Sequence, residues 1–163
     1  MKALITGAHG FVGHYLTDHL ESEGDVVVGV DRHEGPDLLD ADGWRSLVER
    51  VQPEAVYHLA GQADVGGSWA APVETFRANA EGTLNVLEAC AALDVPRVLA
   101  VSSADVYGRV TQAELPLDED SPLRPVSPYA ASKVSADFLA LQAFLGRGPV
   151  SYTHLTLPTK RIV

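Results

Sequence analysis

A glycine-rich turn near the N-terminus constrains the fold of this chain more than any other stretch. Residues 6–13 read Thr-Gly-Ala-His-Gly-Phe-Val-Gly and stand between a short apolar run, 3–5, and a segment with helical spacing, 11–23. Glycines at such a turn let a phosphate group approach the backbone N–H groups at the start of the helix, where the helix macrodipole is positive. The sequence therefore predicts a strand, a phosphate-binding turn and a helix, in that order.

The predicted turn supplies contacts to a dinucleotide cofactor. The residues expected to make them are Gly7, Gly10, Phe11, Val12 and Gly13. A glycine-rich connection that binds no ligand is the alternative interpretation. In the helix that follows, Phe11, Tyr15, Leu16 and Leu20 are expected to face the sheet, because they recur at approximately helical spacing.

The second predicted strand ends in a carboxylate that suits a nucleotide. The continuous apolar run 26–30 is typical of a parallel strand covered on both faces, and Asp31 follows it directly. A carboxylate about 20 residues after the glycine turn accepts hydrogen bonds from the ribose hydroxyls of adenosine. Asp31 therefore favours NAD over NADP, although the neighbouring Arg32 suits the 2′-phosphate of NADP. A simple strand-end cap is the alternative for Asp31.

Composition excludes several classes of function. The chain has 163 residues, which corresponds to one domain, and its net charge of −10 argues against a nucleic-acid partner. Cys90 is the only cysteine and is expected to be a buried, inert thiol, as suits a reducing cytoplasm. Neither a signal peptide nor a membrane-spanning run is apparent, and the six histidines lack metal-ligand spacing. We expect a cytoplasmic protein that binds neither membrane nor metal.

Two later stretches carry candidate catalytic side chains. The predicted strand 97–102 leads to Ser103 and Asp105, and a predicted helix from Ser127 to about residue 144 carries Tyr129 and Lys133. Tyr129 and Lys133 stand at positions i and i+4, so they share one helical face. The lysine cation stabilises a phenolate, which makes Tyr129 a usable general acid or base. Lys133 can also hold ribose hydroxyls, while Ser103 orients the reacting oxygen. Unrelated surface side chains are the alternative.

These stretches together resemble the extended branch of the short-chain dehydrogenase/reductase superfamily, over residues 1 to about 149. The Gly-x-x-Gly-x-x-Gly spacing at 7–13, the strand-end Asp31 and the pair Tyr129 and Lys133 carry the resemblance. Within that branch the chain is similar to the NAD-dependent epimerase/dehydratase family. The resemblance implies a doubly wound α/β, Rossmann-like domain over residues 1–149, with parallel strands in the order 3-2-1-4-5.

The resemblance also implies further contacts to the cofactor. A short third strand at Asp37–Asp40 would pass the adenine, with Asp37 and Leu38 touching it. The backbone of Leu59, Ala60 and Gly61 would lie along the cofactor, whereas His58 before them is expected to be structural. Asn79, in a predicted helix 73–93, would lie near the cofactor; a solvated polar position on that helix is an equal alternative.

The step common to the family is hydride exchange at C4 of a nucleotide sugar, in which Tyr129 would move the hydroxyl proton. Residues 62–69 and 122–129 resemble the GDP-mannose 4,6-dehydratases and the GDP-4-dehydro-6-deoxymannose reductases, so a GDP-sugar is the favoured substrate. The dehydratases carry a glutamate at the position of Asp105, and the shorter aspartate favours a reductase. A nucleotide-sugar 4-epimerase stays open, as does a non-catalytic NAD(P)-sensing or scaffold protein. Relatives often form homodimers through helices like 73–93 and 127–144.

The final residues, 150–163, depart from the family. Residues 150–159 can be encoded by bases that resemble a transposase-type sequencing adapter, so we expect this segment to be a non-native tail. The alternative is a β-prone tail that adds a sixth strand to the sheet edge. The resemblance implies a C-terminal sugar-binding domain beyond these residues. We therefore expect the chain as written to bind NAD(P) weakly and to turn over no nucleotide sugar.

Overall fold

The sheet is parallel throughout and its strands end at one common edge. The computed structural model describes residues 1–147 and 151–154. They form a five-stranded sheet in the order β2-β1-β3-β4-β5, with every neighbouring pair parallel. The strands are β1 (Lys2–Thr6), β2 (Val26–Val30), β3 (Ala55–His58), β4 (Arg97–Ala100) and β5 (Ser151–His154). The predicted α/β, Rossmann-like fold is confirmed.

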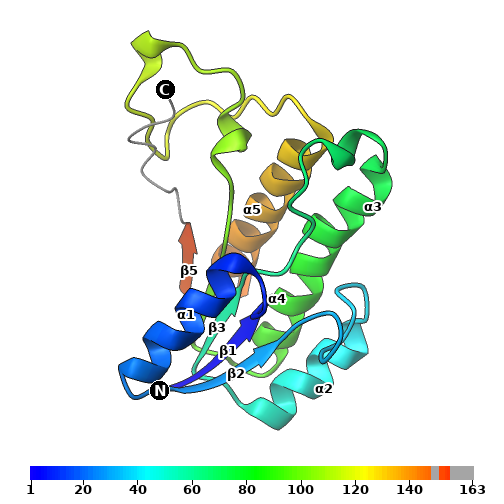
Figure 1. The fold of residues 1–163 in the computed structure, drawn as a ribbon, viewed down its shortest axis with the longest axis vertical. Coiled ribbons are helices and arrows are strands. Elements are labelled where there is room, and N and C mark those ends of the chain that lie inside the picture. The colour runs from blue at the N-terminus through cyan, green and yellow to red at the C-terminus, as the bar shows by residue number, and fades with distance from the viewer. Residues whose placement is uncertain (148–150, 155–163) are drawn as a thin grey trace.

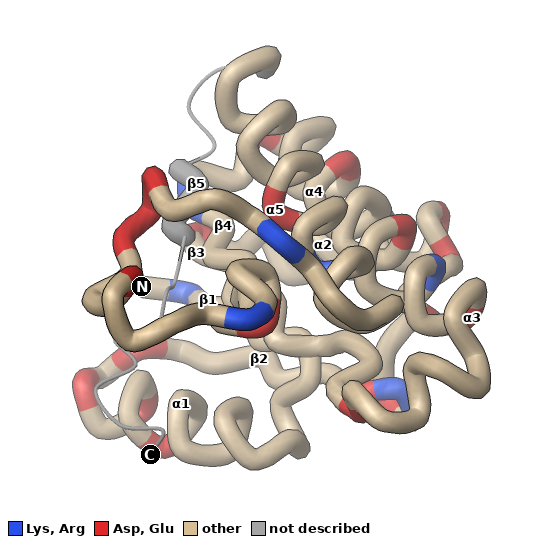
Figure 2. Tube along the Cα trace, turned by 90° about the horizontal axis from the view of Figure 1, so that it is seen from above, with Lys and Arg blue, Asp and Glu red and all other residues tan. Residues whose placement is uncertain are grey.

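Helices cover the two faces of the sheet unequally (Figures 1 and 2). One face carries α1 (Phe11–Ser22), and the other carries α2 (Ala41–Val51), α4 (Gly82–Ala92) and α5 (Pro128–Arg147). Successive residues of a strand point to opposite faces, so Leu4 joins the large apolar cluster with Trp44 and Val86, while Ile5 joins a small cluster with Leu20. This alternation explains why the predicted strands are continuously apolar.

The long helix predicted over 73–93 is interrupted. It consists of α3 (Pro72–Phe76), a π-helical turn (Arg77–Glu81) and α4. In the π-helical turn the N–H of Gly82 donates to the carbonyl of Arg77, five residues earlier. Such wide turns occur frequently at functional sites. This turn carries Asn79, whose side chain is only 2% exposed.

The predicted short strand at Asp37–Asp40 is wrong, because this segment forms a turn. The carboxylate of Asp37 accepts from the N–H of Leu39 at 2.8 Å, and the N–H of Asp40 donates to the carbonyl of Asp37 at 2.9 Å. Asp40 then caps α2 by accepting from the N–H of Gly43 at 2.9 Å. Aspartate side chains that bond nearby backbone compete with a sheet ladder. The sheet therefore ends at β2 on this side.

The predicted inward orientation of Phe11 and Tyr15 is also wrong. Their side chains are 81% and 62% exposed, and their rings contact each other edge to face with centroids 5.2 Å apart. The helix packs through Gly13, whose backbone lies against the turn before it, and through Leu16 and Leu20, spaced three and seven residues further on. This contact fixes the rotation of α1 and directs Phe11 and Tyr15 away from the sheet.

Two other expectations concern the ends of the molecule and its cysteine. Segment 151–154 forms the edge strand β5 beside β4, which corresponds to the sixth strand left open above, whereas residues 148–150 and 155–163 lie outside the described residues. The Cys90 side chain is fully buried, as predicted, and burial raises the pKa of its thiol to about 12.

Candidate nucleotide-binding and active site

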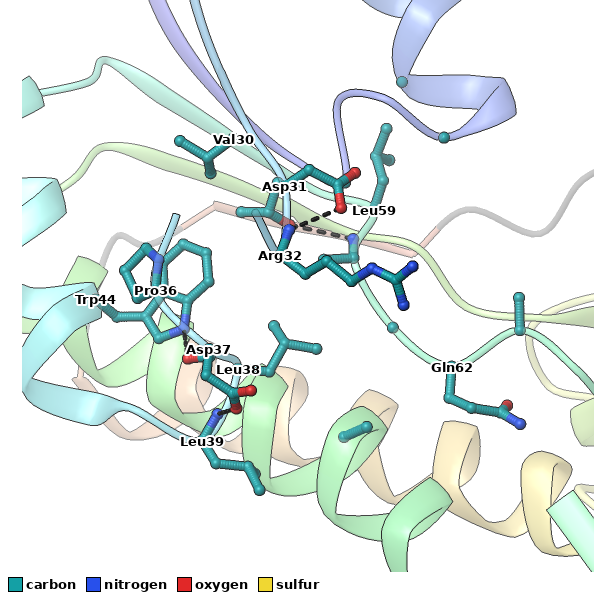
Figure 3. Close-up of a pocket in the computed structure, with 18 of the residues that line it drawn as sticks. Val30, Asp31, Arg32, Pro36, Asp37, Leu38, Leu39, Trp44, Leu59 and Gln62 are labelled. Atoms are coloured by element: carbon teal, nitrogen blue, oxygen red, sulfur yellow. Dashed lines mark hydrogen bonds between the residues drawn. The ribbon is translucent and has the colours of Figure 1, made fainter. Parts of the chain in front are cut away.

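A cleft of about 640 Å³ opens where β1, β2 and β3 end (Figure 3). It brings together most of the residues that the sequence nominated for cofactor binding. Those that line it are Gly7, Gly10, Phe11, Val12, Gly13, Asp31, Arg32, Asp37, Leu38, Leu59, Ala60 and Gly61. The cleft therefore joins the glycine turn, the end of β2, the 36–39 turn and the segment after β3.

The glycine turn is packed so closely that side chains would not fit. Gly7 has φ of +74°, and a Cβ atom placed there would lie 2.8 Å from the backbone nitrogen of Ala60. A Cβ atom on Gly13 would lie 2.3 Å from the carbonyl oxygen of Gly7. No side chain caps the N-terminus of α1 at Gly10. The first N–H groups of this helix are therefore suited to an anion such as a phosphate.

The end of β2 carries the two charges that bear on cofactor choice. Asp31 and Arg32 both line the cleft (Figure 3). One carboxylate oxygen of Asp31 accepts from the N–H of Arg32 at 2.7 Å, while the Arg32 Nε donates to His33 Nε2 at 3.2 Å. A carboxylate and a guanidinium thus stand side by side at the rim, so both a ribose hydroxyl and a phosphate would meet a complementary group.

The turn at 36–39 forms an apolar wall that is held from two helices. The indole nitrogen of Trp44 in α2 donates to the carbonyl of Asp37 at 3.0 Å (Figure 3). The amide of Asn85 in α4 donates to the carbonyl of Leu38 at 2.9 Å. A Cβ atom on Gly82 would lie 2.8 Å from that of Leu38, so this glycine lets Leu38 approach α4. The turn is therefore rigidly placed against the cleft.

The candidate catalytic side chains do not line the cleft itself. Lys133 lies just beyond its end, because a Cβ atom on Gly61 would be 4.0 Å from the Lys133 Nζ. The Lys133 ammonium donates to the carbonyl of Val101 at 3.0 Å, directly after β4. Burial lowers the pKa of Lys133, and the nearby carboxylate of Asp137 acts in the opposite direction. The helix α5 is thereby fixed to the exit of β4.

Ser103 and Asp105 occupy the turn that follows β4. The N–H of Asp105 donates to the hydroxyl of Ser103 at 3.2 Å, and the Asp105 side chain is exposed. Within residues 1–147 and 151–154, no hydrogen bond joins Tyr129 to Ser103 or to Lys133. Ser102 donates to Asp137 on α5 at 2.5 Å, so the β4 exit and the helix are bonded even though the candidate side chains are not.

Asn79 is not a solvated helix residue. Its side chain contacts Gln62, which lines the cleft, by accepting from the Gln62 N–H at 2.8 Å and donating to the Gln62 carbonyl at 3.1 Å. His58 is buried between Thr6 and Thr83, as expected of a structural residue. Burial, together with the charge of Lys133, lowers the pKa of His58 to about 3, so its ring is neutral.

Several residues that line the cleft were missed by the sequence reasoning. They are Thr6, Val30, Pro36, Leu39, Trp44, Gln62, Ala63, Glu74, Arg77 and Ala78. Arg77 and Ala78 stand just before Asn79 on the same helical turn. Their position beside a residue predicted to lie near the cofactor could have indicated that they line the cleft. Trp44 carried no such signal, because its contact with Asp37 depends on how α2 packs.

The described residues contain neither a membrane-spanning helix nor a metal centre. None of their helices combines the length and the apolar character needed to cross a membrane. Within the same part of the chain, no group of three or more His, Cys, Asp or Glu side chains is placed to hold a metal ion.

Curated relatives are similar in sequence to most of this chain. The GDP-6-deoxy-D-mannose reductase of Pseudomonas aeruginosa is 38% identical over 142 residues, which cover 86% of this chain and 46% of the reductase. A GDP-mannose 4,6-dehydratase of Sinorhizobium fredii is 32% identical over 168 residues, which cover 85% of this chain and 47% of the dehydratase. The chain thus spans about half the length of the curated relatives it matches.

Solved structures share the fold. The UDP-glucose 4-epimerase of Thermus thermophilus in complex with NAD superposes with a TM-score of 0.85 and 32% identity, over 94% of this chain and 54% of the epimerase. The RMD structure from Pseudomonas aeruginosa complexed with NADPH gives a TM-score of 0.80 and 34% identity, over 98% of this chain and 55% of that protein. A sequence profile described as the NAD dependent epimerase/dehydratase family matches residues 3–157, so the chain belongs to this family.

Proposed function

We propose that this chain forms the cofactor-binding part of an NAD(P)-dependent nucleotide-sugar enzyme. The cleft carries the proposal, because the glycine turn lines it and Lys133 lies beside Gly61, another residue of its lining. The close backbone packing at Gly7 and Gly13 fixes the turn, and the N-terminus of α1 at Gly10 has no side-chain cap, which suits the approach of a pyrophosphate to its backbone N–H groups. The residues present therefore fit a dinucleotide.

The roles of the side chains follow from their positions and chemistry. A bound nicotinamide would supply the hydride acceptor or donor. Tyr129 transfers the proton of the sugar hydroxyl. The Lys133 cation stabilises the phenolate form of Tyr129, and it also holds ribose hydroxyls. Ser103 holds the reacting oxygen by hydrogen bonding. Support comes from Lys133 Nζ, which lies beside Gly61 at the end of the cleft.

The favoured reaction is reduction of a GDP-linked 4-keto sugar, with a 4,6-dehydratase and a 4-epimerase as the alternatives. A reductase needs no base for the C5 proton, and the short side chain of Asp105 is exposed on the turn after β4. The similarity to a GDP-6-deoxy-D-mannose reductase supports the same choice. A non-catalytic NAD(P)-sensing protein is the alternative from another class, but Ser103, Tyr129 and Lys133 are all present.

The experiment replaces Tyr129 by Phe in a version of the protein that extends to the length of its relatives. We expect kcat to fall about 1,000-fold, because a positioned acid or base contributes roughly 10²–10⁴-fold to the rate. The affinity for NADH, measured by fluorescence titration, should change less than twofold. Retained kcat would contradict the role of Tyr129, and the 163-residue chain without added sequence should show no turnover.

We also propose that the protein pairs with a second copy through α5. Support comes from the apolar side chains of Phe138, Leu141 and Leu145, which are exposed at a spacing of three and four residues and therefore lie along one side of this helix. Phe144 is exposed on the same part of the helix. Large exposed apolar surfaces of this kind are typical of protein interfaces.

A further inference from the structure

A chain of buried polar groups connects the cofactor cleft with the helix that carries Tyr129. Its first part is centred on the imidazole of His58, which lies between two threonine hydroxyls. His58 Nδ1 is 2.7 Å from the Thr6 Oγ1, and His58 Nε2 is 3.0 Å from the Thr83 Oγ1. All three side chains are nearly inaccessible to solvent. The chain is therefore shielded from water.

The neighbouring bonds determine which ring nitrogen carries the proton. The Thr83 hydroxyl donates to the carbonyl of Asn79 at 2.6 Å, so it must accept from His58 Nε2–H. A neutral imidazole then has Nδ1 as an acceptor, and Thr6 donates to it. The Thr6 oxygen in turn accepts from the N–H of Ala60 at 3.1 Å. Every donor in this part has one acceptor, and only the Nε2–H tautomer satisfies them all.

The second part is centred on the side chain of Asn79. Its amide nitrogen donates to the carbonyl of Gln62 at 3.1 Å and to the hydroxyl of Ser132 at 2.9 Å, while its amide oxygen accepts from the N–H of Gln62. The fully buried Ser132 then donates to the carbonyl of Tyr129 at 2.7 Å. The wide π-helical turn lets one asparagine reach both the segment after β3 and α5.

The two ends of the chain of bonds are the two places that the proposed chemistry must bring together. Ala60 and Gln62 line the cleft, and their backbones are bonded to Thr6 and Asn79. Tyr129 and Lys133 stand on the turn of α5 that Ser132 bonds. Between these ends lie residues from β1, β3, the π-helical turn, α4 and α5. The bonds from Lys133 to Val101 and from Ser102 to Asp137 hold α5 at a different place, the exit of β4.

We propose that the buried chain Thr6–His58–Thr83–Asn79–Ser132 is a positioning relay, which fixes the cofactor segment 59–62 relative to the turn of α5 that carries Tyr129 and Lys133. The role of this relay in catalysis rests on the proposed function, whereas the hydrogen bonds that form it do not. His58, Asn79 and Ser132 are positioning residues that act through the groups they hold. His58 serves as a neutral donor at Nε2 and not as an acid or base.

The first test examines the hydrogen bonds of the relay in the absence of any ligand. The 163-residue chain is labelled with ¹⁵N-histidine, and the ring nitrogens of His58 are followed by NMR from pH 8 to pH 5. We expect a neutral Nε2–H tautomer throughout, and we expect Ser132→Ala to move both His58 ring resonances although it removes no bond to His58. An Nδ1–H tautomer, or resonances that Ser132→Ala leaves unchanged, would overturn the relay.

The second test measures coupling in NADH affinity. Thr6→Val and Ser132→Ala each remove one hydroxyl at opposite ends, and each should weaken NADH binding about tenfold, the equivalent of one lost hydrogen bond. Changes at independent sites multiply, so two independent losses would give about a hundredfold effect. We expect the double variant to bind NADH about tenfold more weakly than the unmodified chain, as each single variant does, because either change alone disconnects the relay. A hundredfold loss, or no loss in either single variant, would overturn it.

Two control variants make the result specific. Thr6→Ser keeps the hydroxyl and should restore NADH affinity to within about twofold. Ser135→Ala removes a hydroxyl on the same helix that donates only to the carbonyl of Ala131, and it should leave affinity unchanged. If the unmodified chain binds no NADH, the proposed cofactor function fails, and the NMR test alone decides whether the relay exists.

Discussion

The nucleotide end and the catalytic end of the site are built in opposite ways. At the nucleotide end, Gly7 and Gly13 leave out side-chain atoms so that backbone segments can approach closely. At the catalytic end, buried side chains supply the bonding atoms: His58 bonds Thr83, and Asn79 donates to Ser132. The first end should therefore be sensitive to added atoms and the second to removed or recharged ones.

The largest effect should come from adding one methyl group at the nucleotide end. In a helix the change from Gly to Ala ordinarily stabilises by about 1 kcal/mol, but a Cβ atom on Gly13 would meet the Gly7 carbonyl oxygen at 2.3 Å. We expect Gly13→Ala to lower the free energy of unfolding by about 3 kcal/mol, at the upper end of overpacking effects. Urea unfolding measures this change.

Gly146→Ala is the matched control for this prediction. It is also helical, but a Cβ atom there would meet only the flexible end of Gln142 at 3.1 Å. Its free energy of unfolding should be unchanged or higher by up to about 1 kcal/mol. A Gly13→Ala protein as stable as the unmodified chain would break the contrast between the two ends.

A smaller effect on stability is expected when the pH is lowered into the range where the His58 ring of the unfolded chain takes up a proton. Folding lowers the pKa of His58 from 6.5 to about 3, so below pH 6.5 the unfolded chain takes up a proton that the native chain does not. This contribution to the free energy of unfolding is complete above pH 6.5 and decreases as the pH is lowered below that value. We expect a loss of about 2 kcal/mol in the free energy of unfolding between pH 7 and pH 5.

The variant His58→Asn separates this residue from the carboxylates. Arg124 lowers the pKa of Glu114 to about 2, so this carboxylate stays ionised over the range tested. The variant should be less stable at pH 7 but should lose little further stability down to pH 5, as urea unfolding at the two pH values will show. An equal pH dependence in both proteins would mean that His58 is not the group responsible.

The smallest effect should come from removing an exposed charge at the nucleotide rim. Arg32→Ala should weaken NADPH binding about fivefold and leave NADH binding unchanged, because an exposed charge pair contributes no more than about 1 kcal/mol. Asp31 is present in both proteins, so both should prefer NADH, the variant more strongly than the unmodified chain. Fluorescence titration with both cofactors measures the ratio, and an equal loss for NADH and NADPH would assign Arg32 a role unrelated to the 2′-phosphate.

The nucleotide end was largely predictable from sequence, because backbone geometry there demands particular residues at fixed spacing. Gly7 is required by its positive φ and Gly13 by a contact within the turn, and Asp31 follows from the length of one strand-helix-strand unit. Local sequence was a poor guide where two local structures compete. The aspartates at 37 and 40 bond nearby backbone and form a turn, where the family pattern indicated a strand.

The catalytic end was predictable only in its residue types. The spacing of Tyr129 and Lys133 placed them on one helical face, but the hydrogen-bond partner of Lys133, the Val101 carbonyl, comes from a distant part of the chain. Asn79 gave no signal of burial, because a polar residue in a helix is equally compatible with solvent. Its burial follows from the π-helical turn, which depends on the packing of this helix against α5 and not on a local pattern.

The bond between the Lys133 ammonium and the Val101 carbonyl has a thermodynamic consequence. A lysine side chain held in one conformation loses up to about 2 kcal/mol of rotamer freedom. Here that loss occurs during folding, since a main-chain carbonyl at the end of β4 already holds the ammonium at 3.0 Å. A cofactor that binds beside Gly61 therefore meets a preorganised cation, and little of its binding energy is needed to immobilise this side chain.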